Sequence, residues 1–214
     1  SKPATGRQKR NPDVIVFIAL LPAYVLSIFY RSFLSVIAGP VMADLKIGPA
    51  EFGTLGAAWF ITFAAAQFPV GWALDRLGPR RTVGTAMAIG TAGAFLFATS
   101  ENAWVAVFAM GLVGIGCSPI FMSALYLFAR TQDVARFGVL SSVFIGLGSL
   151  GNLVGAAPLA LAAQSFGWRA TMLGFAAMFL LATVLAAVLV RDPPVATDAS
   201  GRQEGLLQGL KSIV

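Results

Sequence analysis

The sequence is poor in the residues from which most catalytic and metal sites are built. Its 214 residues include no histidine and one cysteine, and only 11% of them are charged. This argues against a disulfide framework, a structural zinc site and histidine-based acid–base catalysis. No cluster of nucleophile, base and acid is visible, so we expect neither an enzyme nor a cofactor or metal. Cys117 lies inside an apolar run, where a small buried hydrophobic residue is expected.

Charge is scarce because most of the chain is apolar. Hydrophobic residues make up 57% of the sequence. A soluble domain could not bury so much apolar surface, and its own surface would need more charge. The composition is typical of a protein that crosses the lipid bilayer several times.

Six apolar runs are long enough to cross a bilayer, which takes roughly 20 helical residues. They lie at 13–38, 51–74, 82–99, 103–129, 137–163 and 169–190. Backbone polar groups must be satisfied internally in lipid, so these runs are predicted to be helices. The expected fold is an all-α membrane protein with six transmembrane helices. The expected domains are a cytoplasmic segment at 1–12, the membrane domain at 13–190 and a cytoplasmic linker at 191–214.

The placement of Lys and Arg predicts the orientation. If the N-terminus is cytoplasmic, all but three of the fifteen basic residues lie on the inner side. Lys46 and Arg169 then lie outside, and Arg31 lies within the membrane. We therefore expect a protein of the cell (inner) membrane with both termini in the cytoplasm. The net charge of +6 is explained without a nucleic-acid partner.

Prolines divide the predicted spans into two groups. The first, second, fourth and fifth spans contain Pro22, Pro69, Pro119 and Pro158, whereas the third and sixth contain none. Proline frees a backbone carbonyl, which is tolerated beside protein or a wet cavity. Ordinary helix packing would also accept these prolines. The division nevertheless suggests a cavity among spans one, two, four and five.

A short charged turn separates the second and third spans. Its key residues are Gly71, Asp75, Arg76, Gly78, Arg80 and Arg81. This order of residues resembles the signature loop between the second and third helices of the major facilitator superfamily, which consists largely of secondary transporters. The resemblance implies transport by alternating access, with these six residues as a conformational latch. A solvated ion pair of Asp75 with a neighbouring arginine is the structural alternative.

Part of this loop recurs later in the chain. The recurrence pairs Pro69, Gly78 and Arg80 with Pro158, Gly167 and Arg169 at a constant offset. One segment would end inside and the other outside, as in a three-plus-three inverted repeat. The superfamily typically has twelve helices, so the resemblance implies that this chain is an N-terminal half. Its partner would be a C-terminal half or a second copy of itself.

The linker carries a possible surface helix. Apolar residues recur at helical spacing at Leu206, Leu207, Leu210, Ile213 and Val214. This pattern predicts a short amphipathic helix at the inner membrane interface.

Arg31 is the candidate substrate contact. An arginine within a membrane span is costly, at about 2.5–3.5 kcal/mol on insertion scales, and no acidic residue within the spans offsets it. Tyr24, Ser27 and Ser35 are spaced to share its helix face. An anionic substrate could supply the missing charge, bound in a bidentate manner. Alternatively, Arg31 snorkels toward the outer interface.

The run 28–36 resembles the first helix of organic-anion symporters and organophosphate exchangers of the same superfamily. That resemblance implies a role for Arg31 in binding carboxylate or phosphate. The symporters often carry an acidic residue nearby, which this chain lacks. Gln67, Tyr126 and Asn152 are secondary candidates for substrate contact, although polar residues in spans more often bond a neighbouring helix. Gly151 and Gly155 are expected to serve close helix packing.

The sequence therefore predicts half of a secondary active transporter for a small organic anion. Two alternatives remain open at this stage. The protein could export apolar or cationic compounds with Arg31 purely structural. It could also be a transporter-like scaffold that assembles membrane complexes and moves nothing.

Overall fold

The computed structural model describes residues 12–190, with side chains from residue 17 onward. Within that range the chain forms helices and turns and contains no strand. The helices are α1 (Pro12–Ser32), α2 (Leu34–Leu45), α3 (Pro49–Leu77), α4 (Pro79–Ala98), α5 (Ala103–Thr131), α6 (Val134–Gly148), α7 (Leu150–Val154), α8 (Ala157–Phe166) and α9 (Trp168–Leu189). The all-α prediction is confirmed. The predicted segments 1–11 and 191–214, including the amphipathic helix, lie outside the described residues.

Two of the predicted spans are broken. The first consists of α1 and α2, which meet at Phe33 with a bend of 55°. The fifth consists of α6, α7 and α8, with breaks at Ser149 and between Val154 and Ala157. Pro158, in the first turn of α8, has no backbone N–H to continue the preceding helix. The bend and the breaks re-aim side chains that a straight helix would have placed on one face.

By length and composition, four helical segments could cross a membrane: α3, α5, α6 to α8 taken together, and α9. The bent pair α1–α2 makes a fifth. The helix α4 is present where the third span was predicted, but its first turn contains Arg80 and Arg81 and it is less apolar. The structure thus supports several membrane spans, and the number six stays a prediction.

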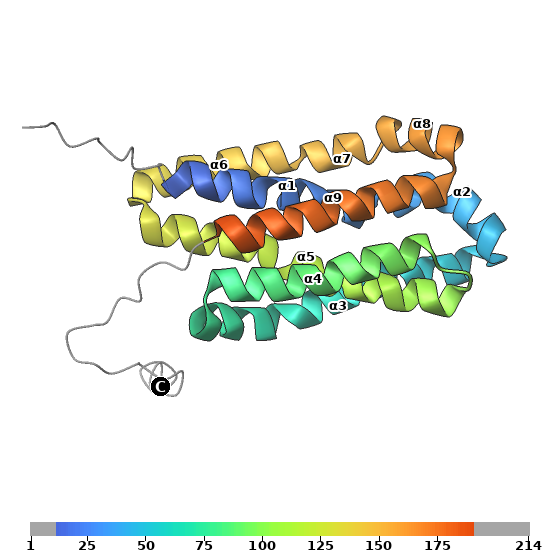
Figure 1. Ribbon diagram of the computed structural model, residues 1–214, viewed down its shortest axis with the longest axis horizontal. Helices are drawn as coiled ribbons and strands as arrows, with labels where there is room; N and C mark the ends of the chain where they lie inside the picture. Colours follow the sequence, from blue (N-terminus) through green and yellow to red (C-terminus); the bar gives the residue numbers. More distant parts are fainter. Residues whose placement is uncertain (1–11, 191–214) are drawn as a thin grey trace, which may run out of the picture.

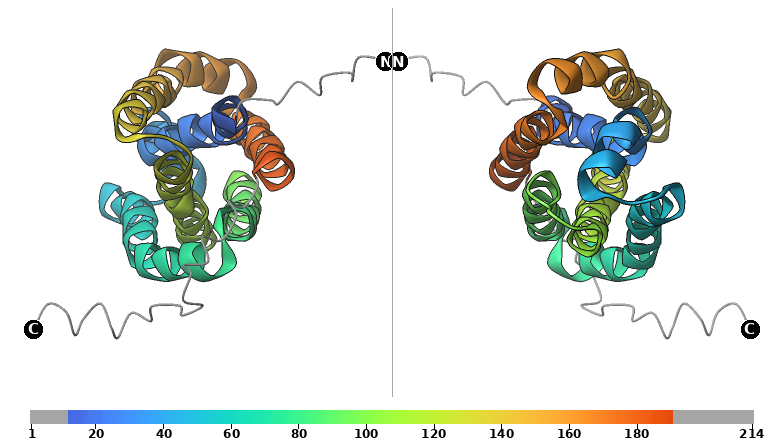
Figure 2. Two further views of the ribbon diagram at one scale, coloured as in Figure 1. Left: turned by 90° about the vertical axis from the view of Figure 1, so that its left-hand side faces the viewer. Right: turned by 90° about the vertical axis from the view of Figure 1, so that its right-hand side faces the viewer.

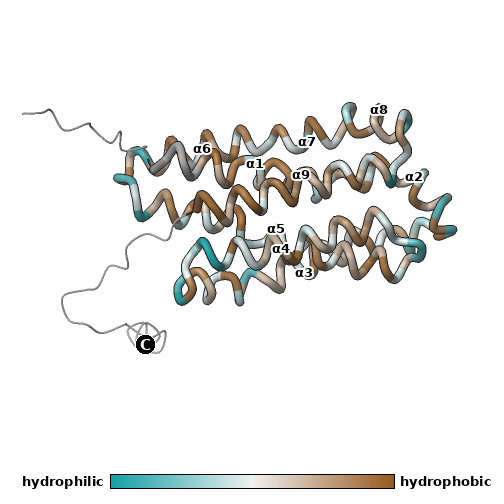
Figure 3. Tube along the Cα trace, viewed as in Figure 1, coloured by the Kyte–Doolittle hydropathy of each residue, from teal (hydrophilic) through white to brown (hydrophobic). Residues whose placement is uncertain are grey.

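The helices run side by side along one long axis (Figure 1). Viewed from the end, α5 and α1 pass through the middle of the bundle, with α6 to α8 on one side and α3 and α4 on the other (Figure 2). The helix α9 packs against α4 and α1. Hydrophilic residues gather at the turns at the two ends, and the helix bodies are mainly hydrophobic (Figure 3). This distribution is the one that a bilayer selects.

Glycines allow α5 to approach α3 and α4 closely. Gly116 faces Gly90 of α4 so tightly that a Cβ on either would meet the backbone of the other. Gly114 faces the backbone of α3 at Trp59, and the hydroxyl of Thr62 donates a hydrogen bond of 2.8 Å to the carbonyl of Gly111. The glycine-rich stretch of this span is therefore a packing surface on two sides, which explains its composition.

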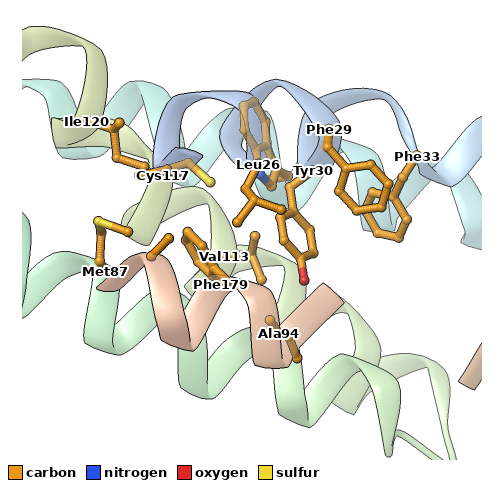
Figure 4. Close-up of a cluster of buried hydrophobic side chains, with 14 of the residues drawn as sticks. Leu26, Phe29, Tyr30, Phe33, Met87, Ala94, Val113, Cys117, Ile120 and Phe179 are labelled. Atoms are coloured by element: carbon orange, nitrogen blue, oxygen red, sulfur yellow. The ribbon is translucent and has the colours of Figure 1, made fainter. Parts of the chain in front are cut away.

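A continuous apolar core joins α1, α4, α5 and α9. Figure 4 shows Leu26 and Tyr30 of α1 beside Val113 and Cys117 of α5 and Phe179 of α9. Cys117 is buried, as predicted for a small hydrophobic residue. The hydroxyl of Tyr30 is also buried and has no hydrogen-bond partner among the described residues. The interior beside α1 is therefore closed by aromatic packing.

The segment α6–α7 lies directly on α1. A side chain at Gly148 would collide with the ring of Tyr24, and one at Gly151 would collide with the carbonyl of Val25. Gly155 also faces α1, but a Cβ there would lie 3.4 Å from Phe29 and would fit more easily. The predicted small-residue face of Gly151 and Gly155 is thus a helix-packing surface, and the need for glycine is strict at Gly151.

Candidate functional site

Arg31 lies in the last turn of α1, immediately before the bend into α2. Its side chain is exposed on the surface of this helical unit. Within residues 17–190 its guanidinium forms no ion pair. The acidic residues of this part of the chain all lie at helix ends or turns, at Asp44, Glu51, Asp75, Glu101 and Asp133. The arginine is therefore available to an external anion.

Tyr24 lies on the same side of α1 as Arg31. Its ring stacks between Phe121 of α5, at a centroid distance of 5.3 Å, and Phe144 of α6, at 4.9 Å. Arg31 follows about two helix turns further along α1. The structure thus keeps these two predicted residues on one helix, and packing fixes the position of the tyrosine ring.

The two predicted serines have different surroundings, and their roles in substrate contact stay predictions. Ser27 is buried within α1. Ser35 lies beyond the bend, in the first turn of α2, and its hydroxyl donates a 2.8 Å hydrogen bond to the carbonyl of Ser32. The spacing argument assumed one straight helix, and the bend of 55° ends that common face after Ser32.

The secondary candidates are spread over three helices. Gln67 is half-buried in α3, and Asn152 is exposed in α7. Tyr126 is half-buried in α5 beneath the guanidinium of Arg130, which lies 4.4 Å from the centre of its ring. Their roles in substrate contact stay predictions.

The charged turn joins α3 to α4. Gly78 has a φ of 81°, a conformation that side chains rarely adopt, so glycine is required here. Asp75 is exposed and forms no ion pair within the described residues. Gly71 lies one turn before Asp75 and is half-buried in α3. The ion pair with a neighbouring arginine, considered as an alternative for Asp75, is therefore not formed among residues 17–190.

The arginines of this turn make different contacts. The guanidinium of Arg76 lies 5.8 Å from the centre of the Trp72 ring. Arg80 donates from Nε to the carbonyl of Ala187 near the end of α9, at 3.1 Å, and Arg81 is exposed. Arg80 thus ties the turn to the end of α9.

At the other end of the bundle the structure reveals a cluster that sequence reasoning missed. Asp44 of α2 and Arg169 of α9 form an ion pair of 2.9 Å. The indole of Trp168 donates to the same carboxylate oxygen at 3.1 Å. The sequence singled out Arg169 as part of a recurring turn, but nothing in it linked this residue to Asp44, which is 125 residues away.

These observations first define a class: an all-helical chain with several apolar helices long enough to cross a membrane and charged turns at both ends of the bundle. A sequence profile of the Major Facilitator Superfamily matches residues 20–214, and the chain belongs to this superfamily. It is therefore a multi-pass membrane protein of a transporter family, as the charged turn predicted.

Two curated relatives agree with this assignment. The chain is 23% identical over 171 residues to a probable sulfoacetate transporter of Cupriavidus necator, covering 80% of this chain and 40% of the relative. It is 25% identical over 188 residues to an uncharacterized MFS-type transporter of Mycobacterium tuberculosis, covering 86% of this chain and 32% of that relative. The chain therefore spans less than half the length of either relative.

Proposed function

We propose that this chain is the N-terminal six-helix half of a secondary transporter that moves a small organic anion across the cell membrane by alternating access. The observation that carries the proposal is the state of Arg31. It is exposed in the first predicted span, on the same helix as the stacked ring of Tyr24, and it forms no ion pair with a described residue.

The charge of Arg31 needs compensation in a membrane. An uncompensated arginine in the bilayer costs several kcal/mol, on the order of 2.5–3.5 on insertion scales. A carboxylate, sulfonate or phosphate can accept two hydrogen bonds from the planar guanidinium and neutralise it. The name of the relative in Cupriavidus necator, a probable sulfoacetate transporter, agrees with an anionic substrate of this kind.

The contacts between α4 and α9 support the inverted repeat. Arg80, at the start of α4, donates to the carbonyl of Ala187 at the end of α9. Arg169, at the start of α9, donates from Nη1 toward the carbonyl of Ala98 at the end of α4, at 3.5 Å. The same sequence offset relates Arg80 to Arg169 and Ala98 to Ala187. The two hydrogen bonds are therefore equivalent: in each, the arginine of one repeat donates to the corresponding alanine carbonyl of the other repeat.

The local backbone repeats as well. Gly78 and Gly167, related by that offset, have φ values of 81° and 79°. Thr82 and Thr171 each donate a 2.8 Å hydrogen bond to the carbonyl of the glycine four residues earlier. These matched turns support two three-helix units of opposite orientation.

A second half would cover apolar surface that this unit leaves open. Large hydrophobic residues are exposed along α3, at Phe60, Ile61 and Phe68, and along α6 to α8, at Val139, Val143 and Leu153. We assign part of this surface to a C-terminal half or, in an isolated unit, to a second copy, and the rest to lipid. The turn between α3 and α4 would then act as the latch at the cytoplasmic face.

Transport by the full protein tests the proposal. Purified protein in proteoliposomes should take up labelled sulfoacetate or be inhibited by small carboxylates, sulfonates or phosphates. Organic cations of similar size serve as the matched control and should neither enter nor compete. Transport of cations or neutral apolar compounds, without competition by any of these anions, would refute the anion assignment.

A further inference from the structure

The cluster at the end of α2 joins three separate parts of the chain. Oδ2 of Asp44 accepts hydrogen bonds from Nε of Arg169 at 2.9 Å and from the indole of Trp168 at 3.1 Å. The remaining nitrogen of the guanidinium, Nη1, donates to the carbonyl of Ser100 at 2.5 Å. One arginine therefore fastens the end of α2 to the start of α9 and to the turn after α4.

These contacts of Asp44 are important because α2 buries few other side chains against the bundle. It is a helix of 12 residues with Pro40 in its interior, and its buried residues are Ile37, Val41 and Leu45. It lies at one end of the bundle beside α8 and the start of α9 (Figure 1). Asp44 and Arg169 also border an open cleft of about 690 Å³, whose other walls are formed by α2 and residues 166–170. Water can therefore reach this contact.

The other end of α2 is the bend that follows Arg31. The two helices α1 and α2 meet there at 55°. The direction of α2 therefore determines which α2 residues lie nearest to the guanidinium of Arg31. A carboxylate that fixes one end of a short helix fixes its direction as well. The cluster and the candidate substrate site are thus connected by one short helix, α2.

We propose that Asp44 is a positioning residue for the Arg31 site: by holding the end of α2 on Trp168 and Arg169, it fixes the bend beside the candidate anion contact. Asp44 does not touch the substrate and acts through α2. The inference rests on the proposed function for its consequence in transport, but the positioning itself can be measured without any substrate.

The first experiment measures how often α2 lifts from the bundle. A cysteine is placed at Val41 of α2, whose side chain is fully buried against the bundle. The background is the full-length protein with Cys117 replaced by alanine. The protein is held in nanodiscs, where both faces are accessible, and is treated with a water-soluble thiol reagent. Labelling then reports the population of the lifted state.

Asp44→Asn should increase the labelling rate by about three- to tenfold, because it removes the ion pair and weakens the remaining hydrogen bonds. Asp44→Glu should restore a rate within about twofold of the parent. Glu101→Gln is the matched control, because Glu101 is an exposed acidic residue in the turn after α4 and forms no ion pair within the described residues. It should leave the rate unchanged.

An unchanged labelling rate in Asp44→Asn, or an equal increase in Glu101→Gln, would overturn the proposal. If Asp44→Asn does not accumulate in cells, Trp168→Phe is tested instead, because it removes the indole hydrogen bond to the same carboxylate. A faster labelling rate in Trp168→Phe is expected, and an unchanged rate would overturn the proposal. In transport assays, Asp44→Asn should change KM and Vmax of the anion together, and Asp44→Glu should restore both. If the full protein carries no anion, the labelling result still decides whether Asp44 positions α2, so the two proposals fail separately.

Discussion

Substitution of Arg31 is the sharpest test of the proposed anion site. Arg31→Gln removes the charge and the fork of donors, whereas Arg31→Lys keeps the charge and loses the fork. The guanidinium has no ion-pair partner among the described residues, so neither change breaks an internal salt bridge. Expression and membrane insertion should therefore stay near those of the parent, since removing a charge does not hinder insertion.

The expected size of the effect follows from the bonds that are lost. A hydrogen bond to a charged group contributes about 1.5–3 kcal/mol, which corresponds to roughly ten- to a hundredfold in affinity. Arg31→Gln should lose at least that much and abolish measurable transport at low substrate concentration. Arg31→Lys should weaken transport severely while leaving some activity, because one charged donor remains.

The assay is binding and uptake of the best anion by the full protein in proteoliposomes. Arg136→Gln is the control, because Arg136 is also an exposed arginine but lies in the first turn of α6, away from the bend. It should keep the affinity of the parent. Normal substrate affinity in Arg31→Gln would refute the reasoning, since Arg31 would then only snorkel toward the interface.

Three further predictions concern orientation, packing and association. An impermeant thiol reagent on intact cells should label a cysteine at Gly48 and spare one at Leu77; the reverse result would invert the topology. Leu77 is used because the adjacent Gly78 has a φ of 81° and would strain a cysteine. Gly116→Ala should destabilise the protein by about 1–3 kcal/mol, measured as a lower melting temperature, because the new methyl meets Gly90. Gly53→Ala, where nothing lies within 4 Å, should change it little, and an equal loss would contradict the packing argument. Cross-linking of the isolated unit should join copies through α1, α3, α5 and α6 to α8, and cross-links mainly through α4 and α9 would count against the proposed interface.

Much of the architecture could be predicted because hydrophobicity and charge are local properties. A long apolar run without barrel-strand alternation forms a helix in lipid, so the helical class and the approximate helix positions followed from the positions of the apolar runs. The turn around Gly78 could be recognised because its glycine and charges stand in a fixed order within a few residues. The superfamily was identified from those residues, and the sequence profile confirms it.

The details of the candidate site depended on tertiary contacts. Helical spacing grouped Ser35 with Arg31 on one straight helix, but a bend of 55° at Phe33 lies between them. Tyr24 was placed on the correct helix, yet its rigid stacking requires Phe144 from a distant segment. Spacing along one helix is not enough when the helix bends, because side-chain direction changes with the axis.

The sequence by itself determined that this protein is a helical membrane protein of the superfamily and that Arg31 is a charge in an apolar run. Those properties depend on neighbouring residues and on the bilayer as solvent. Only the tertiary structure decided that Asp44 meets Trp168 and Arg169, and that glycines bring α4 and α5 together at Gly90. Such contacts join residues far apart in the chain, and their geometry exists only once the helices have packed.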